Sequence, residues 1–345
     1  MKLLIITQTV DRNDHNLGFF HTWIKKIAGQ VEQLTVICLR KGDYDLPSNV
    51  KVLSLGKEDR VSRLAYIFRF YHYIFSERKH YDDVFVHMNP EYVILGGLFW
   101  RLSKKKILLW YTHKSVNFRL RLAEKLATKI FTASKESFRL SSKKVEVTGH
   151  GIDVDFFSSA LHTQERKSLR FMCVGRISLV KDLETVILAF HKMKKGSHEF
   201  SVTLDIIGEP ITTADREYKN VLEELIQKCD VSDTVHFVGG RTYTEMAKEY
   251  ARSDVLIHTS RTGSVDKVVL EALASGLQVI TSSEAYGALG DMVERFPANS
   301  PEALSVALEK SLSAGILTRN QKAASFVKSH FSLDRILNRI VAYFE

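Results

Sequence analysis

The sequence predicts an α/β protein built from two doubly wound parallel-sheet domains. Three observations lead to this fold class. At 345 residues the chain is too long for one typical domain. Short β-rich runs alternate with segments of helical period, and this series occurs twice. A polar, weakly patterned stretch at residues 158–168 separates the two series.

The elements follow one another in regular alternation. In the first half the predicted strands are KLLIIT, QLTVICL, VFVH, KILLWYT, KIFTAS and VEVTG, and the predicted helices lie near residues 19–29, 60–77, 91–103 and 118–127. In the second half the strands are LRFMCVG, VTLDIIG, TVHFVGG, DVLIHTS and LQVITSS, and the helices lie near residues 182–195, 214–229, 244–252 and 266–275. We therefore expect domains at residues 1–160 and 161–331, with a C-terminal helix at about 332–345 that packs back on the first domain.

The positive charge is confined to the first half of the chain. Residues 1–160 hold 26 Lys and Arg against 16 Asp and Glu, a net charge of +10, whereas residues 161–345 hold 23 against 24, a net charge of −1. We expect the first half to meet an anionic surface or substrate.

Neither a membrane span nor a disulfide framework is predicted. No stretch approaches the roughly 20 apolar residues that a membrane span needs, and the start MKLLIITQTVDRND indicates a first strand rather than a signal peptide. Three cysteines in apolar or amphipathic segments suit reduced packing residues: Cys38, Cys173 and Cys229. We expect a cytoplasmic protein.

Ligands of open α/β sheets bind beyond the carboxyl ends of the strands, so the residues there are candidates for chemistry. Gly18 lies where the loop after the first strand meets a helix. Glycine at such a position allows a phosphate to approach backbone N–H groups at the positive end of the helix. An ordinary turn glycine explains the same residue equally well.

Two cations follow the first strand of the second half, in VGRISLVKDLETVI. Arg176 comes directly after the strand and a glycine, and Lys181 follows five residues later at the start of a helix. A guanidinium and an ammonium that converge above a sheet edge suit a diphosphate, which favours an anion site over solvated surface charge.

A carboxylate, Glu271, lies in the apolar helix after the strand DVLIHTS. It projects from the first turns of that helix beside the same sheet edge as Arg176. A carboxylate there can accept hydrogen bonds from vicinal hydroxyls such as those of a ribose. The alternative is a surface glutamate near a favourable helix end.

Three motif observations narrow the ligand. The first strand is not followed by G-x-G-x-x-G, which weakens a dinucleotide site, and no G-x-x-x-x-G-K-[ST] phosphate loop is present. The two D-x-D pairs, Asp43/Asp45 and Asp153/Asp155, have no neighbouring ligand residues in the sequence. We do not expect a bound metal or a cofactor.

The chain resembles the glycosyl transferases group 1 family, the retaining family 4 nucleotide-sugar glycosyltransferases. The motifs that carry the resemblance are LGFF, VGRISLVKDLETVI, VHFVGG and VDKVVLEALASGLQVITS. The resemblance covers nearly the whole chain and implies the GT-B fold, in which two Rossmann-like domains face a cleft. It also implies a nucleotide-diphosphate sugar as the donor, an acceptor held mainly by the first domain, no metal, and a role such as polysaccharide biosynthesis.

The resemblance assigns roles residue by residue. Arg176 and Lys181 match the cations on the donor diphosphate, and Gly18 matches the glycine near the phosphates. Glu271 matches the glutamate that holds the ribose. His113, after the strand KILLWYT, matches a histidine near the sugar and acceptor, although without the resemblance a capping or packing histidine is favoured. The loop at residues 235–240, with Val238 and Gly239, matches the one that frames the base.

One position departs from the family pattern. Eight residues before Glu271 the family usually has another glutamate, close to the donor sugar, and this chain has Gly263. The same loop offers three further candidates for donor binding, namely Ser264, Asp266 and Lys267. Asp266 could replace the missing carboxylate if the backbone brings it inward.

The implied mechanism is front-face displacement with retention of configuration. Arg176 and Lys181 stabilise the negative charge that grows on the leaving diphosphate, which can itself take the proton of the acceptor.

The acceptor is a glycan or a lipid-linked molecule. Basic and aromatic residues interleave at 60–80, with a cationic cluster at 101–106. This pattern suits peripheral contact with an anionic membrane, but it also suits a core helix with a solvated face, which we favour. Nucleic-acid binding is disfavoured because no known binding module is present.

Two other functions remain open. A nucleotide-sugar epimerase would also use twin domains of this kind, but it would need more acid and base carboxylates. A non-catalytic protein that binds a nucleotide sugar or a glycan would explain Gly263.

Overall fold

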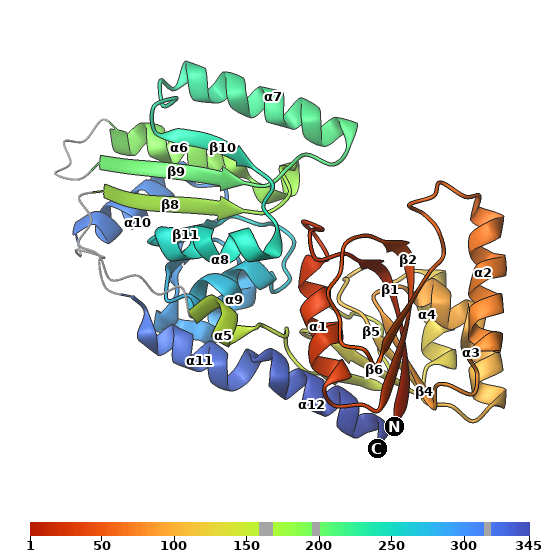
Figure 1. Ribbon diagram of the computed structural model, residues 1–345. Coiled ribbons are helices and arrows are strands. Elements are labelled where there is room, and N and C mark those ends of the chain that lie inside the picture. Colours follow the sequence, from red (N-terminus) through yellow and green to blue (C-terminus); the bar gives the residue numbers. More distant parts are fainter. Residues whose placement is uncertain (159–167, 195–200, 314–318) are drawn as a thin grey trace. The chain divides into compact units, whose positions relative to one another are not determined.

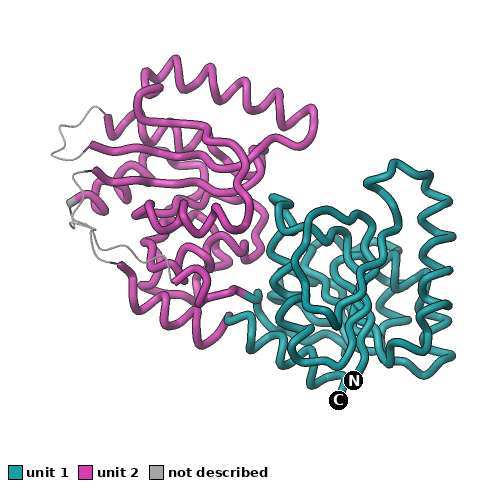
Figure 2. Tube along the Cα trace, viewed as in Figure 1, with its two compact units in different colours: residues 1–151, 332–345 teal, residues 152–331 magenta. Residues whose placement is uncertain are grey.

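The computed structural model describes residues 1–158, 168–194, 201–313 and 319–345 of the chain. These residues form two compact units, shown in separate colours in Figure 2. Unit 1 comprises residues 1–151 and 332–345, and unit 2 comprises residues 152–331. The two units thus meet in the sequence at 151/152 rather than at the predicted 160/161. Most of the polar stretch predicted as the boundary, 158–168, lies outside the described residues.

The boundary differs because a short helix after residue 151 packs within unit 2. This helix, α5 (Val154–Ser158), buries Phe157 completely. The Phe157 ring lies edge-on to two tyrosines of unit 2, with centroid distances of 5.4 Å to Tyr243 and 5.6 Å to Tyr250. A buried aromatic residue of this kind ties α5 to unit 2.

Unit 1 is a seven-stranded sheet in the order β3-β2-β1-β4-β5-β6-β7, and all of its pairings are parallel. Its strands are β1 (Lys2–Val10), β2 (Gln33–Lys41), β3 (Val50–Ser54), β4 (Asp83–His87), β5 (Ile107–Trp110), β6 (Lys129–Thr132) and β7 (Val145–Val147). Its helices are α1 (Gly18–Ala28), α2 (Arg63–Ser76), α3 (Pro90–Leu102), α4 (Phe118–Leu126) and α12 (Leu333–Phe344).

Helices cover both faces of this sheet (Figure 1). Alternate residues of β1 serve the two sides, since Leu3 and Ile5 pack with α1 and α12 while Leu4 and Ile6 pack with α2, α3 and α4. Burial on both faces explains the nearly continuous apolar run of β1. The C-terminal helix α12 therefore completes the core of unit 1 on the α1 side.

Unit 2 is a six-stranded parallel sheet in the order β10-β9-β8-β11-β12-β13. Its strands are β8 (Ser168–Val174), β9 (Ser201–Ile207), β10 (Val235–Gly239), β11 (Val255–His258), β12 (Gln278–Thr281) and β13 (Glu294–Arg295). Its helices besides α5 are the 3-10 turn η1 (Leu179–Lys181), α6 (Leu183–Lys194), α7 (Thr213–Lys228), α8 (Tyr243–Arg252), α9 (Lys267–Ala274), η2 (Glu284–Met292), α10 (Pro301–Ser313) and α11 (Gln321–Phe331).

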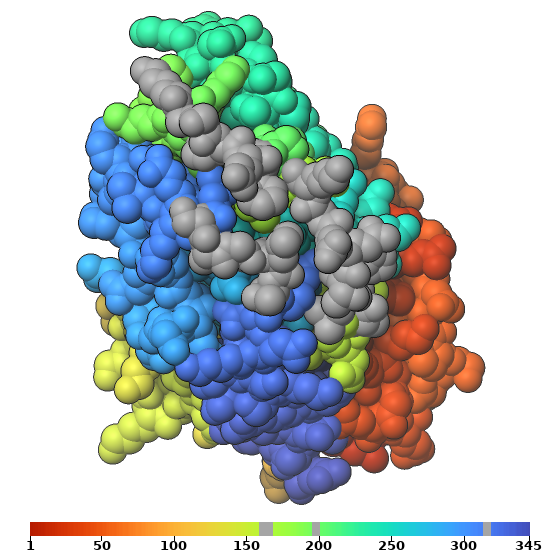
Figure 3. Space-filling view, turned by 90° about the vertical axis from the view of Figure 1, so that its left-hand side faces the viewer, coloured from red at the N-terminus to blue at the C-terminus, as the bar shows by residue number. Residues whose placement is uncertain are grey.

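Both faces of the second sheet are covered as well. Phe171 and Cys173 of β8 pack with α6, α7 and α10, whereas Met172 packs with α5, α8, α9 and α11. The blue surface of α10 and α11 forms much of the side of unit 2 seen in Figure 3. The predicted fold class, with two doubly wound parallel-sheet units, is confirmed.

Local sequence explains where the helices of unit 2 begin. Thr212 and Asp215 form a reciprocal capping box at the start of α7, and Thr242 and Glu245 form another at the start of α8. Both helices leave the carboxyl ends of strands, so the caps fix the loops at that edge of the sheet. Among the described residues no helix is both long and apolar enough to cross a membrane.

Candidate functional site

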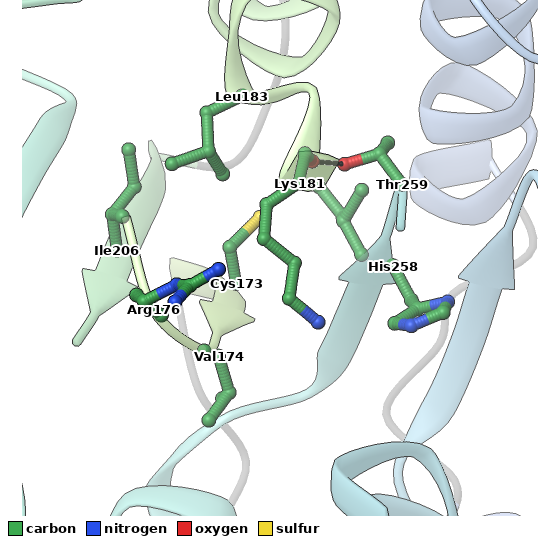
Figure 4. Close-up of a pocket in the computed structure, with 10 residues that line it drawn as sticks. Cys173, Val174, Arg176, Lys181, Leu183, Ile206, His258 and Thr259 are labelled. Atoms are coloured by element: carbon green, nitrogen blue, oxygen red, sulfur yellow. Dashed lines mark hydrogen bonds between the residues drawn. The ribbon is translucent and has the colours of Figure 1, made fainter. Parts of the chain in front are cut away.

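A pocket lies at the point in unit 2 where the strand order reverses. From β8 the chain builds the sheet outward to β9 and β10, and β11 then begins the other half on the opposite side of β8. Helices diverge above such a switch point, which leaves a crevice beyond the strand ends. The pocket is a shallow depression that is partly open to solvent. It is lined by Cys173, Val174, Gly175, Arg176, Lys181, Leu183, Ile206, Ile257, His258 and Thr259 (Figure 4).

Lys181 enters this pocket and forms an ion pair there. Its side chain runs from η1 toward the region between Cys173 and His258 (Figure 4). The Nζ atom donates to Oδ2 of Asp266 at 2.6 Å and lies 3.5 Å from Oγ of Ser260. Gly175 makes room for this path, since a Cβ there would lie 3.1 Å from Cε of Lys181. The loop before α9 therefore holds the predicted cation in place.

His258 binds the same oxygen of Asp266 as Lys181 does. Its Nε2 lies 3.1 Å from Asp266 Oδ2, and its Nδ1 lies 3.0 Å from Oγ1 of Thr281. The ionised Asp266 carboxylate can only accept, whereas the Thr281 hydroxyl can donate to Nδ1 while it accepts from the backbone N–H of Ser283. The hydrogen of the neutral imidazole consequently lies on Nε2, which donates to Asp266.

The charges in this cluster follow from burial and pairing. Burial alone would raise the pKa of Asp266, but the His258 hydrogen bond and the Lys181 charge hold it below its usual value. Burial lowers the pKa of His258, partly offset by Asp266. At neutral pH the cluster therefore contains a cation, a carboxylate and a neutral imidazole.

Arg176 is the more accessible of the two predicted cations. It follows β8 and Gly175, and its side chain is 46% exposed with Nε 3.9 Å from Oδ2 of Asp215. Its backbone depends on two glycines at positive φ, because a Cβ on Gly208 would lie 1.9 Å from the carbonyl oxygen of Gly175. The structure thus brings Arg176 and Lys181 to one pocket, with only Arg176 largely open to solvent.

The loop between β11 and α9 carries the position that departs from the family pattern. Gly263 has a φ of +66° and open space where a Cβ would project. Its neighbour Ser264 donates to Oγ1 of Thr262 at 3.3 Å, and Thr262 in turn contacts Ser260. The loop turns Asp266 inward, and its backbone exchanges hydrogen bonds with the Tyr286 hydroxyl at 2.6 and 3.2 Å. The backbone therefore does bring this carboxylate inward.

Glu271 is more enclosed than the sequence led us to expect. It is buried in α9, and its Oε2 accepts a hydrogen bond from the Tyr250 hydroxyl at 3.0 Å. Burial raises the pKa of Glu271, partly offset by the charge of Lys267 and the Tyr250 hydrogen bond. Burial also lowers the pKa of Lys267 to about 8, although Glu271 opposes this. The alternative of a surface glutamate is therefore wrong, because Glu271 is buried and its carboxylate already has partners within unit 2.

Val238 and Gly239 end β10 at the same edge of the sheet. The Val238 carbonyl accepts from Arg241 at 2.6 Å. Gly239 has a φ of +78°, and a Cβ there would lie 3.0 Å from Oε1 of Glu209. The same oxygen of Glu209 accepts from the backbone N–H of Gly240 at 3.1 Å. This loop is thus held close to the end of β9.

Of the two candidates of unit 1, Gly18 is the first residue of α1, and His113 lies on the loop after β5. The backbone N–H of Gly18 donates to the carbonyl of Asp14 at 2.9 Å, so this group is not available to a phosphate in this conformation. His113 is exposed, and its Nδ1 accepts from the backbone N–H of Ser115 at 3.1 Å. The Nε2 atom of a neutral His113 therefore carries the hydrogen.

Sequence analysis missed His258, Thr259 and Tyr286. His258 is the last residue of β11, so its position at a strand end was an available signal. Thr259 Oγ1 donates to the Lys181 carbonyl at 2.5 Å and fixes η1. The contact of Tyr286 with Asp266 joins residues 20 positions apart across a loop and left no sequence pattern.

Comparison with known proteins adds relatives for the second unit in particular. Residues 157–326 match the model of the family described as glycosyl transferases group 1. The alpha-monoglucosyldiacylglycerol synthase of Streptococcus pneumoniae is 32% identical over 115 residues, which cover 33% of this chain and 24% of that protein. The D-inositol 3-phosphate glycosyltransferase of Pseudarthrobacter chlorophenolicus is 23% identical over 175 residues, which cover 47% of this chain and 41% of that protein. The chain thus spans less than half the length of these curated relatives.

Solved structures resemble the whole chain. The structure of Anabaena HepE in complex with UDP aligns with a TM-score of 0.77 and 16% identity, over 99% of both chains. A glycosyltransferase from Rickettsia africae aligns with a TM-score of 0.73 and 15% identity, over 99% of this chain and 98% of that one. At such low identity the likeness establishes the fold.

Proposed function

Residues 157–326 belong to the glycosyl transferases group 1 family and the chain has the GT-B fold, and on this premise we propose that it is a retaining glycosyltransferase of family 4. It transfers a sugar from a nucleotide-diphosphate sugar to a glycan or lipid-linked acceptor, without a metal. We propose that it works in the cytoplasm, in a pathway such as polysaccharide biosynthesis.

One observation carries this proposal, the convergence of Arg176 and Lys181 on the pocket at the strand switch point of unit 2. In our proposal both cations bind the donor diphosphate. Bond cleavage moves negative charge onto the leaving phosphate, so contacts that strengthen with that charge lower the barrier. Two fixed cations supply this stabilisation in place of a divalent metal. UDP in the structure of Anabaena HepE supports a nucleotide ligand for this fold.

Lys181 meets the diphosphate in competition with Asp266. In the structure the Asp266 carboxylate pairs with the Lys181 ammonium at 2.6 Å. A phosphate oxygen that contacts Lys181 takes over part of this pairing, and His258 retains its hydrogen bond to Asp266. Asp266 thereby sets how much of the Lys181 charge the donor receives.

The remaining donor contacts come from the other candidates in unit 2. Glu271 accepts ribose hydroxyls through Oε1, since Tyr250 already occupies Oε2. Ser264 and the loop around Gly263 lie toward the sugar, and Lys267 supports the charge of Glu271. Val238 and Gly239 frame the base.

In our proposal the acceptor binds mainly to unit 1, where the family resemblance assigns His113 to the acceptor and sugar and Gly18 to the phosphates. In the front-face mechanism the acceptor hydroxyl attacks on the side of the leaving group and passes its proton to the departing phosphate oxygen. The acceptor oxygen forms the new bond to the anomeric carbon as the bond to the phosphate breaks. The name of one curated relative, alpha-monoglucosyldiacylglycerol synthase, supports a lipid-linked acceptor.

The test is a donor screen followed by a transfer assay. Melting temperatures are measured with UDP-, GDP- and ADP-sugars, and the stabilising donor is incubated with lipid and glycan acceptors in EDTA. We expect one donor to stabilise the protein, and product with the anomeric configuration of the donor by NMR. Arg176→Ala should abolish the stabilisation.

Other outcomes would identify the alternatives. Donor binding without transfer or hydrolysis would favour a protein that only binds a nucleotide sugar. The observation behind this alternative is Gly263 in place of the usual acid. A free epimerised sugar would identify an epimerase. No stabilisation by any nucleotide sugar would refute the proposed site.

A further inference from the structure

The helix α2 of unit 1 carries apolar side chains on two different faces. Its inward face buries Phe70 and Ile74 in the core. A second row of apolar side chains, spaced as i, i+4 and i+11 along the helix, points to solvent: Leu64 is 68% exposed, Phe68 is 74% exposed and Phe75 is 44% exposed. Side chains on this second row contribute little to the core, so their apolar character needs another explanation.

The exposed row continues onto the neighbouring helix α3. The Tyr71 hydroxyl donates to the Leu95 carbonyl at 3.1 Å, and the rings of Phe75 and Phe99 lie edge to face with centroids 4.6 Å apart. At the end of α3, Leu98 and Leu102 are again largely exposed. We name this surface the α2–α3 face, defined by the exposed Leu64, Ile67, Phe68, Phe75, Leu98 and Leu102 and the partly buried Tyr71 and Phe99.

Cations outnumber acids around the α2–α3 face, where Asp59 pairs with Arg69 and Glu91 pairs with Arg119. Residues 60–76 and 92–119 contain no Asp or Glu. The only acid between positions 60 and 80 is Glu77, which is buried and binds Lys51 and His80. Exposed cations lie at both ends of the face, and they are Arg60, Arg63, Arg78, Lys79, Arg101 and Lys104.

We propose that the α2–α3 face docks on the surface of an anionic membrane. Exposed aromatic and aliphatic side chains enter the boundary between headgroups and acyl chains, while the surrounding cations meet anionic headgroups. The excess charge of +10 in residues 1–160 draws unit 1 to such a surface over a longer range. The sequence alone favoured a core helix with a solvated face, and the exposed apolar row is what the structure adds.

A second copy of the chain is a poorer occupant. A symmetric dimer would place the same patch of both copies together, so the cations of one copy would face those of the other. Like charges across an interface oppose association, whereas anionic headgroups neutralise them. The membrane is therefore the occupant that satisfies both the apolar row and the charges.

Vesicle flotation tests this proposal without donor or acceptor, so its outcome is independent of the proposed activity. The full chain is mixed with vesicles of phosphatidylcholine alone or of phosphatidylcholine with phosphatidylglycerol. We expect flotation with the anionic vesicles, weakened by salt, and little with the neutral ones. The double variant Leu64→Ser, Phe68→Ser should lose at least about ten-fold in binding, because two large apolar side chains no longer enter the bilayer. Arg63→Glu with Arg101→Glu should lose about as much.

The matched control is Val306→Ser, which removes a side chain of α10 in unit 2 that is 63% exposed. It should bind vesicles like the unmodified protein, and unchanged melting temperatures should show that the variants fold. Equal binding by the Leu64/Phe68 variant and the unmodified protein would overturn the proposal. A second result would also overturn it: the unmodified protein does not bind vesicles but self-associates in sedimentation, and the Leu64/Phe68 variant does not self-associate. The α2–α3 face would then join two copies of the chain.

Discussion

Replacement of Asp266 by Asn separates the charge of this residue from its shape. The carboxamide of the introduced asparagine can still accept a hydrogen bond from Nε2 of His258 and one from Lys181, so the local geometry is kept. The negative charge that neutralises the Lys181 ammonium at 2.6 Å is lost. We expect a nucleoside diphosphate to bind more tightly to this variant, although the protein itself becomes less stable.

The size of the effect on binding follows from the distances. A phosphate charge about 4 Å from Lys181 Nζ lies about 6 Å from the Asp266 carboxylate, where repulsion is about 3 kcal/mol at an effective dielectric constant of about 20. One fifth of the Asp266 side chain is exposed, so solvent screens part of this energy. A gain of about 1–2 kcal/mol remains, which is about 5- to 30-fold in affinity.

The stability of the variant should change in the opposite direction. The pKa of Asp266 is lower in the folded protein than in the unfolded chain, so its charge stabilises the fold above the unfolded pKa of about 4. This contribution is lost as the pH falls through the lower folded pKa. The melting temperature of Asp266→Asn should therefore lie below that of the unmodified protein at pH 7, and the gap should shrink in acid.

The assay is calorimetric titration with UDP, GDP and ADP, using whichever binds the unmodified protein. Lys181→Met should lose about 1.5–3 kcal/mol of binding free energy as one charge-assisted contact disappears. In the Lys181→Met background, Asp266→Asn should increase nucleotide affinity less than it does alone. Without Lys181 the diphosphate is held less closely to residue 266. Weaker nucleotide binding by Asp266→Asn alone would refute the competition and make Asp266 a residue that only positions Lys181.

Three further outcomes are expected in unit 2. Arg176→Ala should weaken nucleotide binding at least about ten-fold. The melting temperature should stay nearly constant, because the half-exposed Arg176 lies 3.9 Å from Asp215 and is weakly paired. A large loss of stability would contradict this. Glu271→Gln should lower the melting temperature, since Tyr250 and Lys267 lose a charged partner, and an unchanged melting temperature would show that these contacts do not stabilise the fold. The stability of the unmodified protein should rise relative to that of Lys267→Met between pH 8 and 10.5, where the unfolded chain alone still binds the proton, and a difference that does not change with pH in denaturant titrations would contradict this.

Elements buried on both faces were the easiest to predict from the sequence. β1 and β8 are short apolar runs with turn residues on either side, and each was predicted from its apolar run alone. β3 was missed, because this edge strand is only partly buried and contains the exposed Lys51. The helices α10 and α11 were not predicted, although their apolar spacing is helical.

The site was only partly predictable. Arg176 and Lys181 were predicted because they follow a strand end and a glycine. Their positions depend only on the register of one strand and on one turn. The partners of Lys181 were not accessible in this way, because Asp266 lies 85 positions further on and meets it only through the pairing of β8 with β11. The burial of Glu271 was not predicted, because its partner Tyr250 comes from another helix.

The place of α12 in unit 1 has a consequence for the order in which the chain can fold during synthesis. Residues 152–331 leave the ribosome before α12, so unit 2 has all of its residues while unit 1 still lacks its last helix. Until then the side of α1 formed by Phe20, Trp23 and Ile27 has no cover from the buried row of α12. We expect the nascent first unit to expose this apolar face throughout the translation of the second, and to recruit chaperones there until α12 arrives.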